Sequence, residues 1–217
     1  FITVQADVEE VIVTANKKEE TVQDIPMNIS VITDVDIQER GISTPEDFLR
    51  SLAGVTTPGG SRYFTFRGLN TSSAQRSSGT TSTYVDEVPG EVMNIFDIDR
   101  IEVLRGPQGT LYGRNVTGGL INLISARPTG DTSGYANMQY GNLGQTRISS
   151  AFNVPLTDNV AARVAYSSYV QDGMVKNLNL GTEIDDRDSQ AVRLSVDWDI
   201  SDGNTLQSVS YTHLRAH

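Results

Sequence analysis

Apolar and polar residues alternate along the chain from Ser133 to its end. The clearest stretch runs from Val192 to Ile200, where every even position is apolar and every odd position is polar. Weaker alternation occupies residues 148–154 and 160–166. Successive side chains of a strand point to opposite faces, so this pattern predicts antiparallel strands with one apolar and one polar face. About five such strands fit, each near the ~9–11 residues that cross a bilayer at a tilt.

Residues 25–128 show a different pattern, in which short apolar strands alternate with helix signals. A strand over 29–32 leads into a short helix capped by Thr33 or Asp34. Thr44 precedes a second helix, which has proline at its first position and aspartate three residues after the cap. The segment therefore predicts a mixed α/β domain. Its other expected elements are a strand over 63–66, a polar loop over 70–83, and a turn at Asp86–Glu87 that Tyr84–Val85 and Val88 flank.

Five glycines separate two short apolar runs, Ile101 to Leu104 and Leu120 to Ile124. Glycine adopts backbone angles that other residues avoid, and Pro107 fixes its own φ. The stretch therefore predicts a strand, a compact connection and a second strand. Its charged residues are expected to form a charged strand face: Asp97, Asp99, Arg100, Glu102 and Arg105.

The N-terminal segment has a short β-prone patch, Val11 to Ala15, between charged flanks. A single strand with polar flanks cannot bury itself, so we expect it to be mobile unless a partner sheet takes it up. An ordinary edge strand is the alternative, and the residues alone favour neither.

Composition and motif spacing argue against several classes of function. The net charge of −10 argues against a nucleic-acid partner, because phosphate contact needs a basic surface. With no cysteine, disulfides and thiolate metal sites are impossible. Gly113 and Gly118 have the spacing of a phosphate-binding loop, but position 119 is glycine where that loop needs lysine. His213 and His217 make a poor metal site, and no catalytic constellation is visible. We therefore expect no catalytic residue, metal or cofactor, and no enzyme activity.

Three blocks resemble the TonB-dependent outer-membrane receptors, in the order that this family has them. Residues 10–15 (Glu-Val-Ile-Val-Thr-Ala) resemble the TonB box, and residues 24–32 (Asp-Ile-Pro-Met-Asn-Ile-Ser-Val-Ile) the opening of the plug domain. Residues 100–115 resemble the central motif of the plug. The positions that carry the plug resemblance are Arg67, Gly68, Arg100, Glu102, Arg105, Gly106, Pro107, Gly109, Gly113, Arg114, Gly118 and Gly119.

The resemblance implies an α+β plug domain followed by the start of an antiparallel transmembrane β-barrel in the lipid of a Gram-negative outer membrane. The expected divisions are an N-terminal segment (1–24), a plug (25–130) and incomplete first barrel strands (131–217). Five strands leave open edges, so a longer protein is expected.

The family's activity is uptake of a scarce nutrient, most often a ferric siderophore, through energised rearrangement of the plug. The resemblance implies that Glu10, Val11, Ile12, Val13, Thr14 and Ala15 bind the periplasmic C-terminal domain of TonB as an added strand. Ligand contacts are expected at the outward plug tips, at Arg62, Tyr63 and Arg76.

Two positions depart from the family pattern. Ala53 replaces a usual proline, and Glu87 lies where the Asp-Gly-Val-Pro turn commonly has glycine. If that turn needs a positive φ, Glu87 is strained or the turn differs. The alternative function is a soluble periplasmic or surface-binding α/β module with a β-sandwich, which shares the alternation and the acidic balance.

Overall fold

The structure is a computed structural model that describes residues 12–14, 20–21, 23, 25, 27–42, 44–57, 64–70, 79–90, 94–178, 183–184, 186–201 and 203–216. The chain divides into two compact units, Phe1–Ser125 and Ala126–His217. Within the described ranges, no helix is both long enough and apolar enough to cross a bilayer.

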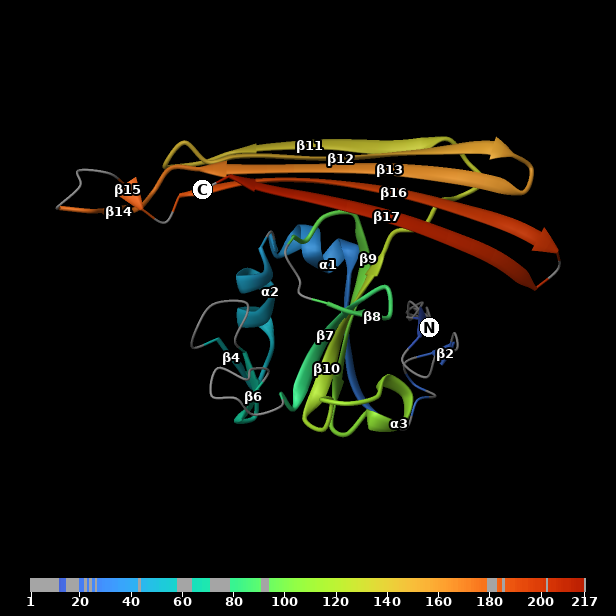
Figure 1. The fold of residues 1–217 in the computed structure, drawn as a ribbon, viewed down its shortest axis with the longest axis horizontal. Helices are drawn as coiled ribbons and strands as arrows, with labels where there is room; N and C mark the ends of the chain where they lie inside the picture. Colours follow the sequence, from blue (N-terminus) through green and yellow to red (C-terminus); the bar gives the residue numbers. More distant parts are fainter. Residues whose placement is uncertain are drawn as a thin grey trace, which may run out of the picture. The chain divides into compact units, whose positions relative to one another are not determined.

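The first unit is built on a five-stranded sheet with the strand order β3-β9-β10-β7-β8 (Figure 1). Its central strands, β9 (Ile98–Arg105) and β10 (Gly119–Ser125), pair antiparallel, and the connection between them contains the short helix α3 (Gly109–Tyr112). The predicted strand, compact connection and strand are therefore confirmed. β3 (Asn28–Thr33) pairs antiparallel with β9, β7 (Thr81–Val85) pairs parallel with β10, and β8 (Val88–Pro89) pairs antiparallel with β7.

Two short helices follow β3, as the capping signals predict. α1 (Asp34–Glu39) is capped by Thr33, whose hydroxyl accepts from the Asp36 N–H while the Asp36 carboxylate accepts from the Thr33 N–H. α2 (Pro45–Ser51) has the same reciprocal arrangement between Thr44 and Asp47. Such boxes satisfy N–H groups that a helix start would leave unpaired. Of the two predicted caps for α1, the structure has Thr33.

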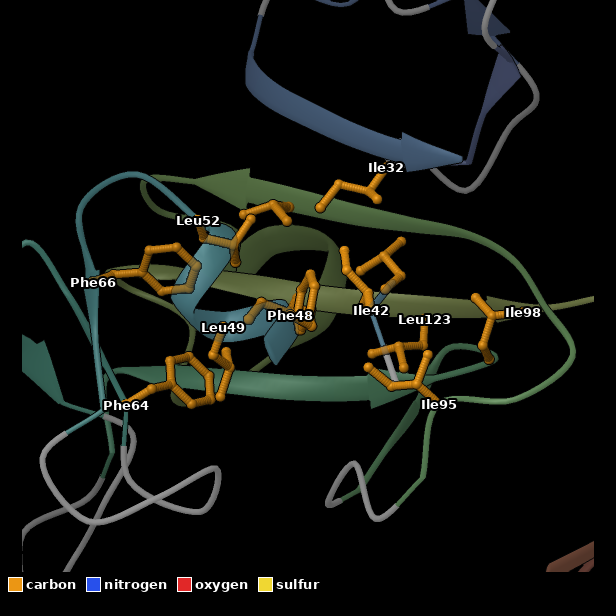
Figure 2. Close-up of a cluster of buried hydrophobic side chains, with 13 residues drawn as sticks. Ile32, Ile42, Phe48, Leu49, Leu52, Phe64, Phe66, Ile95, Ile98 and Leu123 are labelled. Atoms are coloured by element: carbon orange, nitrogen blue, oxygen red, sulfur yellow. The ribbon is translucent and has the colours of Figure 1, made fainter. Parts of the chain in front are cut away.

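The core on one face of this sheet collects side chains from α2 and the central strands. Phe48 and Leu49 of α2 lie among Ile42, Phe64 and Leu123 (Figure 2). Phe64 and Phe66 meet edge to face, with ring centroids 5.7 Å apart. The amphipathic face of α2 is thus the reason that it packs here. The small strands of the first unit are β1 (Ile12–Val13), β2 (Glu20–Thr21), β4 (Val55–Thr56), β5 (Thr65–Phe66) and β6 (Leu69–Asn70).

The turn between β7 and β8 shows how the chain accommodates Glu87 at a position where the family commonly has glycine. Asp86 and Glu87 have φ of 49° and 66°, so both adopt the left-handed conformation of a tight hairpin turn. The turn therefore keeps the geometry that glycine favours, and Glu87 bears a conformational cost there. The Asp86 carboxylate accepts from the Ser125 N–H at 2.8 Å, which ties the turn to the end of β10.

The second unit is a five-stranded antiparallel sheet in chain order, which confirms the five predicted strands (Figure 1). The strands have 8 to 15 residues. Between β13 and β16 lies a two-stranded ribbon of β14 (Val175–Lys176) and β15 (Glu183–Ile184). The five strands are β11 (Ser133–Tyr140), β12 (Thr146–Thr157), β13 (Val160–Gln171), β16 (Arg187–Ser201) and β17 (Asn204–Ala216).

The apolar face of this sheet is the exposed one. In register, Phe152 lies opposite Val164, and Val164 lies opposite Leu194. These three side chains are 55%, 47% and 44% exposed, and Trp198 on the same face is 45% exposed. A soluble sandwich would bury such a face between two sheets. Among the described residues no second sheet packs on this face, so the structure does not show the β-sandwich alternative, and the exposed apolar face has the pattern of strands with a lipid-facing side.

Candidate functional site

The N-terminal β-prone patch is docked on the first unit. Ile12 and Val13 pair antiparallel with Thr21 and Glu20, so the described part of the patch has a partner strand that we did not predict. Val13 is fully buried in a second hydrophobic cluster, on the sheet face opposite the α2 core. Its neighbours there include Leu104 of β9, Leu120 of β10 and Tyr84 of β7. The patch is therefore packed against the domain through one side chain.

Thr14 attaches the same segment to β9 by polar contacts. Its backbone N–H donates to Glu102 Oε1 at 2.8 Å, and its hydroxyl donates to the same oxygen at 3.2 Å. Arg100 Nε donates to Glu102 Oε1 at 2.9 Å, and Arg100 Nη2 donates to the Thr14 hydroxyl at 3.3 Å. Arg100 also pairs with the exposed carboxylate of Asp99 at 2.6 Å. Hydrogen bonds to a charged acceptor are the stronger kind, so Thr14 is the polar anchor of the segment.

The prediction that Glu102 lies on a charged strand face is wrong, because the residue is buried. Its side chain has no exposed surface, whereas Arg100 keeps 15% and Asp99 52% of theirs. Glu102 therefore belongs to the interior, where its charge is compensated by Arg100. Its second oxygen, Oε2, has no hydrogen-bond partner among the described residues, and the same holds for Nδ2 of Asn122, directly opposite on β10.

Two tyrosines lie beside this buried polar pair. Tyr84 and Tyr112 meet edge to face with centroids 5.2 Å apart, and the Tyr84 hydroxyl donates to the Tyr112 carbonyl at 2.7 Å. Burial raises the pKa of Tyr112 above its ordinary value, and the carboxylates of Glu102 and Glu87 raise it further. Tyr112 therefore stays neutral where an exposed tyrosine would begin to ionise.

The glycines of the central motif permit close packing. A Cβ on Gly119 would lie 2.4 Å from the Leu104 carbonyl oxygen, and Gly119 has φ of 135°. A Cβ on Gly118 would lie 2.9 Å from Thr81 and 3.0 Å from Leu69. Only glycine fits both positions without movement of neighbours, so these residues set the start of β10.

The other predicted motif residues have different surroundings. Arg105 donates to the Ser30 hydroxyl at 2.6 Å on the neighbouring strand β3. Arg67 and Gly68 form the turn between β5 and β6, both with positive φ. The structure thus brings Arg100 and Glu102 together with Thr14, and does not bring Arg67 or Arg114 to them. The remaining motif positions, Gly106, Pro107, Gly109, Gly113 and Arg114, lie in the connection between β9 and β10, where Pro107 and Arg114 are exposed.

Several predicted site residues lie outside the described residues. They are Glu10, Val11 and Ala15 of the N-terminal segment and the three predicted ligand contacts, Arg62, Tyr63 and Arg76. In the part of the chain that the structure describes, no group of three or more histidine, aspartate and glutamate side chains is placed to hold a metal ion.

Sequence reasoning missed Tyr84, Tyr112 and Asn122. A signal for Asn122 was present, because it interrupts the apolar run Leu120 to Ile124, as Glu102 interrupts Ile101 to Leu104. A polar residue inside a buried strand needs a partner, and the two interruptions face each other. The arrangement holds the N-terminal strand on β9 through polar contacts with Glu102 and Arg100.

Comparison with known proteins places this geometry in a family. Residues 21–120 match the family described as the TonB-dependent receptor plug domain. The vitamin B12 transporter BtuB of Vibrio vulnificus is 29% identical over 175 residues, 75% of this chain and 28% of that protein. The pesticin receptor of Yersinia pestis is 29% identical over 192 residues, 83% of this chain and 28% of that protein. The chain thus spans 28% of the length of these relatives, which are a transporter and a receptor, not enzymes.

Solved structures show the same fold. The pyoverdine outer membrane receptor FpvA of Pseudomonas aeruginosa matches with a TM-score of 0.78 at 19% identity, over 96% of this chain and 31% of that one. The ferric yersiniabactin uptake receptor FyuA of Yersinia pestis matches with a TM-score of 0.76 at 21% identity, over 86% of this chain and 31% of that one. The fold is therefore a plug domain followed by the first strands of an antiparallel barrel. Residues 21–120 thus carry the plug domain of the TonB-dependent receptors, and the relatives that resemble the chain are a receptor and a transporter.

Proposed function

We propose that the protein takes up a scarce nutrient by energised rearrangement of its plug, and that residues 10–15 bind the periplasmic C-terminal domain of TonB as an added strand. The single observation that carries this proposal is the docking of Thr14 on the buried Glu102. A pull on residues 10–15 would act on β9, at the centre of the plug sheet, through that contact.

The docking is weak enough to be reversible. Each intramolecular hydrogen bond contributes about 0.5–1.5 kcal/mol, and about 1.5–3 kcal/mol when one group is charged. The β1–β2 ribbon has only two residue pairs, so it adds little by itself. Release therefore costs a few hydrogen bonds and the burial of Val13, a cost that strand pairing with another protein can offset. Val11, Ile12 and Val13 have suitable β propensity for such pairing.

The ligand that we propose is a ferric siderophore. Two structures of matching fold carry names of this kind, the receptors for pyoverdine and ferric yersiniabactin. A second candidate, cobalamin, has support from the similarity to the vitamin B12 transporter. Arg62 and Arg76 are the residues that we propose to meet an anionic ferric complex at the outward plug tips, with Tyr63 beside them.

The test of TonB engagement is Ile12→Pro in the full-length receptor, with Ile12→Val as the matched control. Proline removes the backbone donor that strand pairing needs, whereas valine keeps both donor and β propensity. We expect the proline variant to bind ligand at the cell surface and to lose uptake, while the valine variant transports normally. Normal uptake by the proline variant would remove residues 10–15 from the coupling step.

The test of the ligand is growth of a deletion strain on a panel of ferric siderophores, cobalamin and glycans. Loss of growth on one ferric siderophore supports the proposal, and loss on cobalamin alone overturns it in favour of the second candidate. Replacing Arg62 and Arg76 with alanine should then raise the dissociation constant for the identified ligand. An unchanged constant would exclude both arginines from the site.

A further inference from the structure

The side chain of Asn153 on β12 forms hydrogen bonds to residues 129–131, the segment that leads into the barrel strands. We call this set of hydrogen bonds the clamp. The Asn153 Oδ1 accepts from the Thr129 N–H at 2.8 Å. Its Nδ2 donates to the Thr129 carbonyl at 2.8 Å, to the Thr129 hydroxyl at 2.7 Å and to the Asp131 carbonyl. The side chain amide thus uses its acceptor and both donor hydrogens on residues 129–131. Asn153 has no exposed surface, so water does not replace these bonds while the contact holds.

The clamp is not needed to set the register of the sheet. β11 and β12 already pair through eight successive residues, from Ser133 with Asn153 to Tyr140 with Thr146. The apolar and polar alternation on both sides of Asn153 also fixes which face each side chain takes. A buried asparagine whose side-chain hydrogen bonds all go to one preceding segment therefore has a second role, which is to fix that segment.

The segment that the clamp holds, residues 129–131, follows shortly after the plug in the chain. Only Ala126, Arg127 and Pro128 separate the last residue of β10 from Thr129. Residues 126–131 therefore form a short connection, which we call the tether. Just before it, the Ser125 N–H donates to the Asp86 carboxylate. Proline at 128 stiffens the tether, since its φ is fixed.

We propose that Asn153 is a positioning residue that fixes residues 129–131, the segment that follows the plug, to strand β12. Force applied at residues 10–15 then deforms the plug between Thr14 and Thr129 and does not draw the plug away whole. The clamp itself stands on the hydrogen bonds of Asn153 to Thr129 and Asp131, whereas its mechanical role rests on the proposed function.

The first measurement tests the clamp without any transport. Hydrogen exchange at the Thr129 amide is followed in the purified full-length receptor for the wild type and for Asn153→Ala. The matched control is Asn159→Ala, which removes another asparagine bond to backbone in the same sheet, from Nδ2 to the Asp199 carbonyl at 3.1 Å. Loss of a buried hydrogen-bond partner should speed exchange at Thr129 by about tenfold or more in Asn153→Ala. The control should leave it unchanged.

A second variant protects the test against misfolding of the barrel strand. Thr129→Ala removes one acceptor of the clamp from the tether side and leaves β12 intact. It should move exchange at the residue-129 amide in the same direction by about threefold. If neither variant changes exchange at residues 129–131, the clamp does not exist in solution and the proposal is overturned.

The second measurement separates anchoring from mere structure. We expect Asn153→Ala to bind ligand with unchanged dissociation constant and to lose at least about half of its TonB-dependent uptake, with Asn159→Ala normal in both. If Asn153→Ala speeds exchange at the Thr129 amide but leaves uptake normal, the clamp does not contribute to transport, and the mechanical role is overturned. If Ile12→Pro also transports normally, the proposed function fails first, and the exchange result at Thr129 still decides whether Asn153 holds the tether.

Discussion

The Thr14 backbone N–H donates to Glu102 Oε1 at 2.8 Å, across 88 positions of the chain. A backbone donor cannot be removed by mutation of Thr14 to another ordinary residue, so the acceptor decides whether the contact exists. Glu102 is fully buried on β9, a central strand of the plug, and it receives the N-terminal segment together with Arg100. The segment that we propose to meet TonB is thus attached to one of the most buried carboxylates of the plug.

Glu102→Ala should release the N-terminal segment. Loss of a charge-assisted hydrogen bond costs about 1.5–3 kcal/mol, so exchange at the Thr14 amide should rise by about tenfold or more. Glu102→Gln keeps an acceptor oxygen and should have a smaller effect. Glu39→Ala, at the exposed end of α1, is the matched control and should leave the exchange rate as it is. A Thr14 amide equally protected in Glu102→Ala and wild type would contradict this account of the docking.

The Asp86–Glu87 turn makes opposite predictions for two neighbouring glycine substitutions. Glu87→Gly should raise the free energy of unfolding by about 0.5–1 kcal/mol, because φ of 66° costs a residue with a Cβ and costs glycine little. Asp86→Gly relieves a similar strain at φ of 49° but also deletes the carboxylate that holds the Ser125 N–H. It should lower stability by about 1 kcal/mol. Urea unfolding of a chain ending at Pro128 measures both, and equal effects of the two substitutions would refute the argument.

Gly119→Ala tests the close approach of β10 to β9. The added methyl would lie 2.4 Å from the Leu104 carbonyl oxygen at a φ of 135°, and we expect a loss of about 3 kcal/mol. Gly109→Ala is the matched control in the same motif, because nothing lies within 4 Å of its added Cβ. In the helix α3 that change should be neutral or stabilising by about 0.5 kcal/mol. Similar unfolding midpoints for the two variants would show that Gly119 is not needed for packing.

Much of the fold was predictable because its signals are local. The caps at Thr33 and Thr44 and the alternation from Val192 to Ile200 each depend on residues near in sequence. The Asp86–Glu87 turn was also foreseen, including the problem at Glu87. Local rules thus gave the helices, the turn and the five barrel strands.

The contacts that define the candidate site were not predictable by the same rules. Thr14 meets Glu102 and Asn153 meets Thr129 through tertiary packing, 88 and 24 positions away. We predicted that Glu102 lies on a charged strand face, because four other charged residues lie close to it in the sequence. Only the tertiary structure, in which Thr14 and Arg100 lie against it, shows that its side chain is covered. The predicted contacts at Arg62, Tyr63 and Arg76 stay predictions.

Tyr112 gives the plug a stability limit at high pH. Burial, with Glu102 and Glu87 nearby, raises its pKa above the ordinary value of 10.0. The folded plug therefore keeps the phenol proton that the unfolded chain would lose. The stabilisation that accompanies this is fully present below pH 10 and is lost as the pH rises from 10 toward the folded pKa. Tyr112→Phe should flatten the decline of unfolding free energy above pH 10, and an identical alkaline slope in both proteins would contradict it.

The two units should behave differently when expressed apart from the rest of a receptor. The plug has two buried clusters of its own, one around Phe48 and one around Val13, and a chain ending at Pro128 should be soluble and monomeric. The 217-residue chain adds β11 and β17, whose outer edges are unpaired in the described sheet, and an exposed apolar face that includes Phe152 and Trp198. Open edges pair with other chains in water, and in lipid each unpaired backbone group costs several kcal/mol. We therefore expect the 217-residue chain to aggregate in buffer and to form no heat-modifiable pore in vesicles, as judged by light scattering and by gel mobility before and after boiling. Monodisperse 217-residue protein in buffer, or stable insertion of that chain alone, would show that the exposed face and open edges do not control its behaviour.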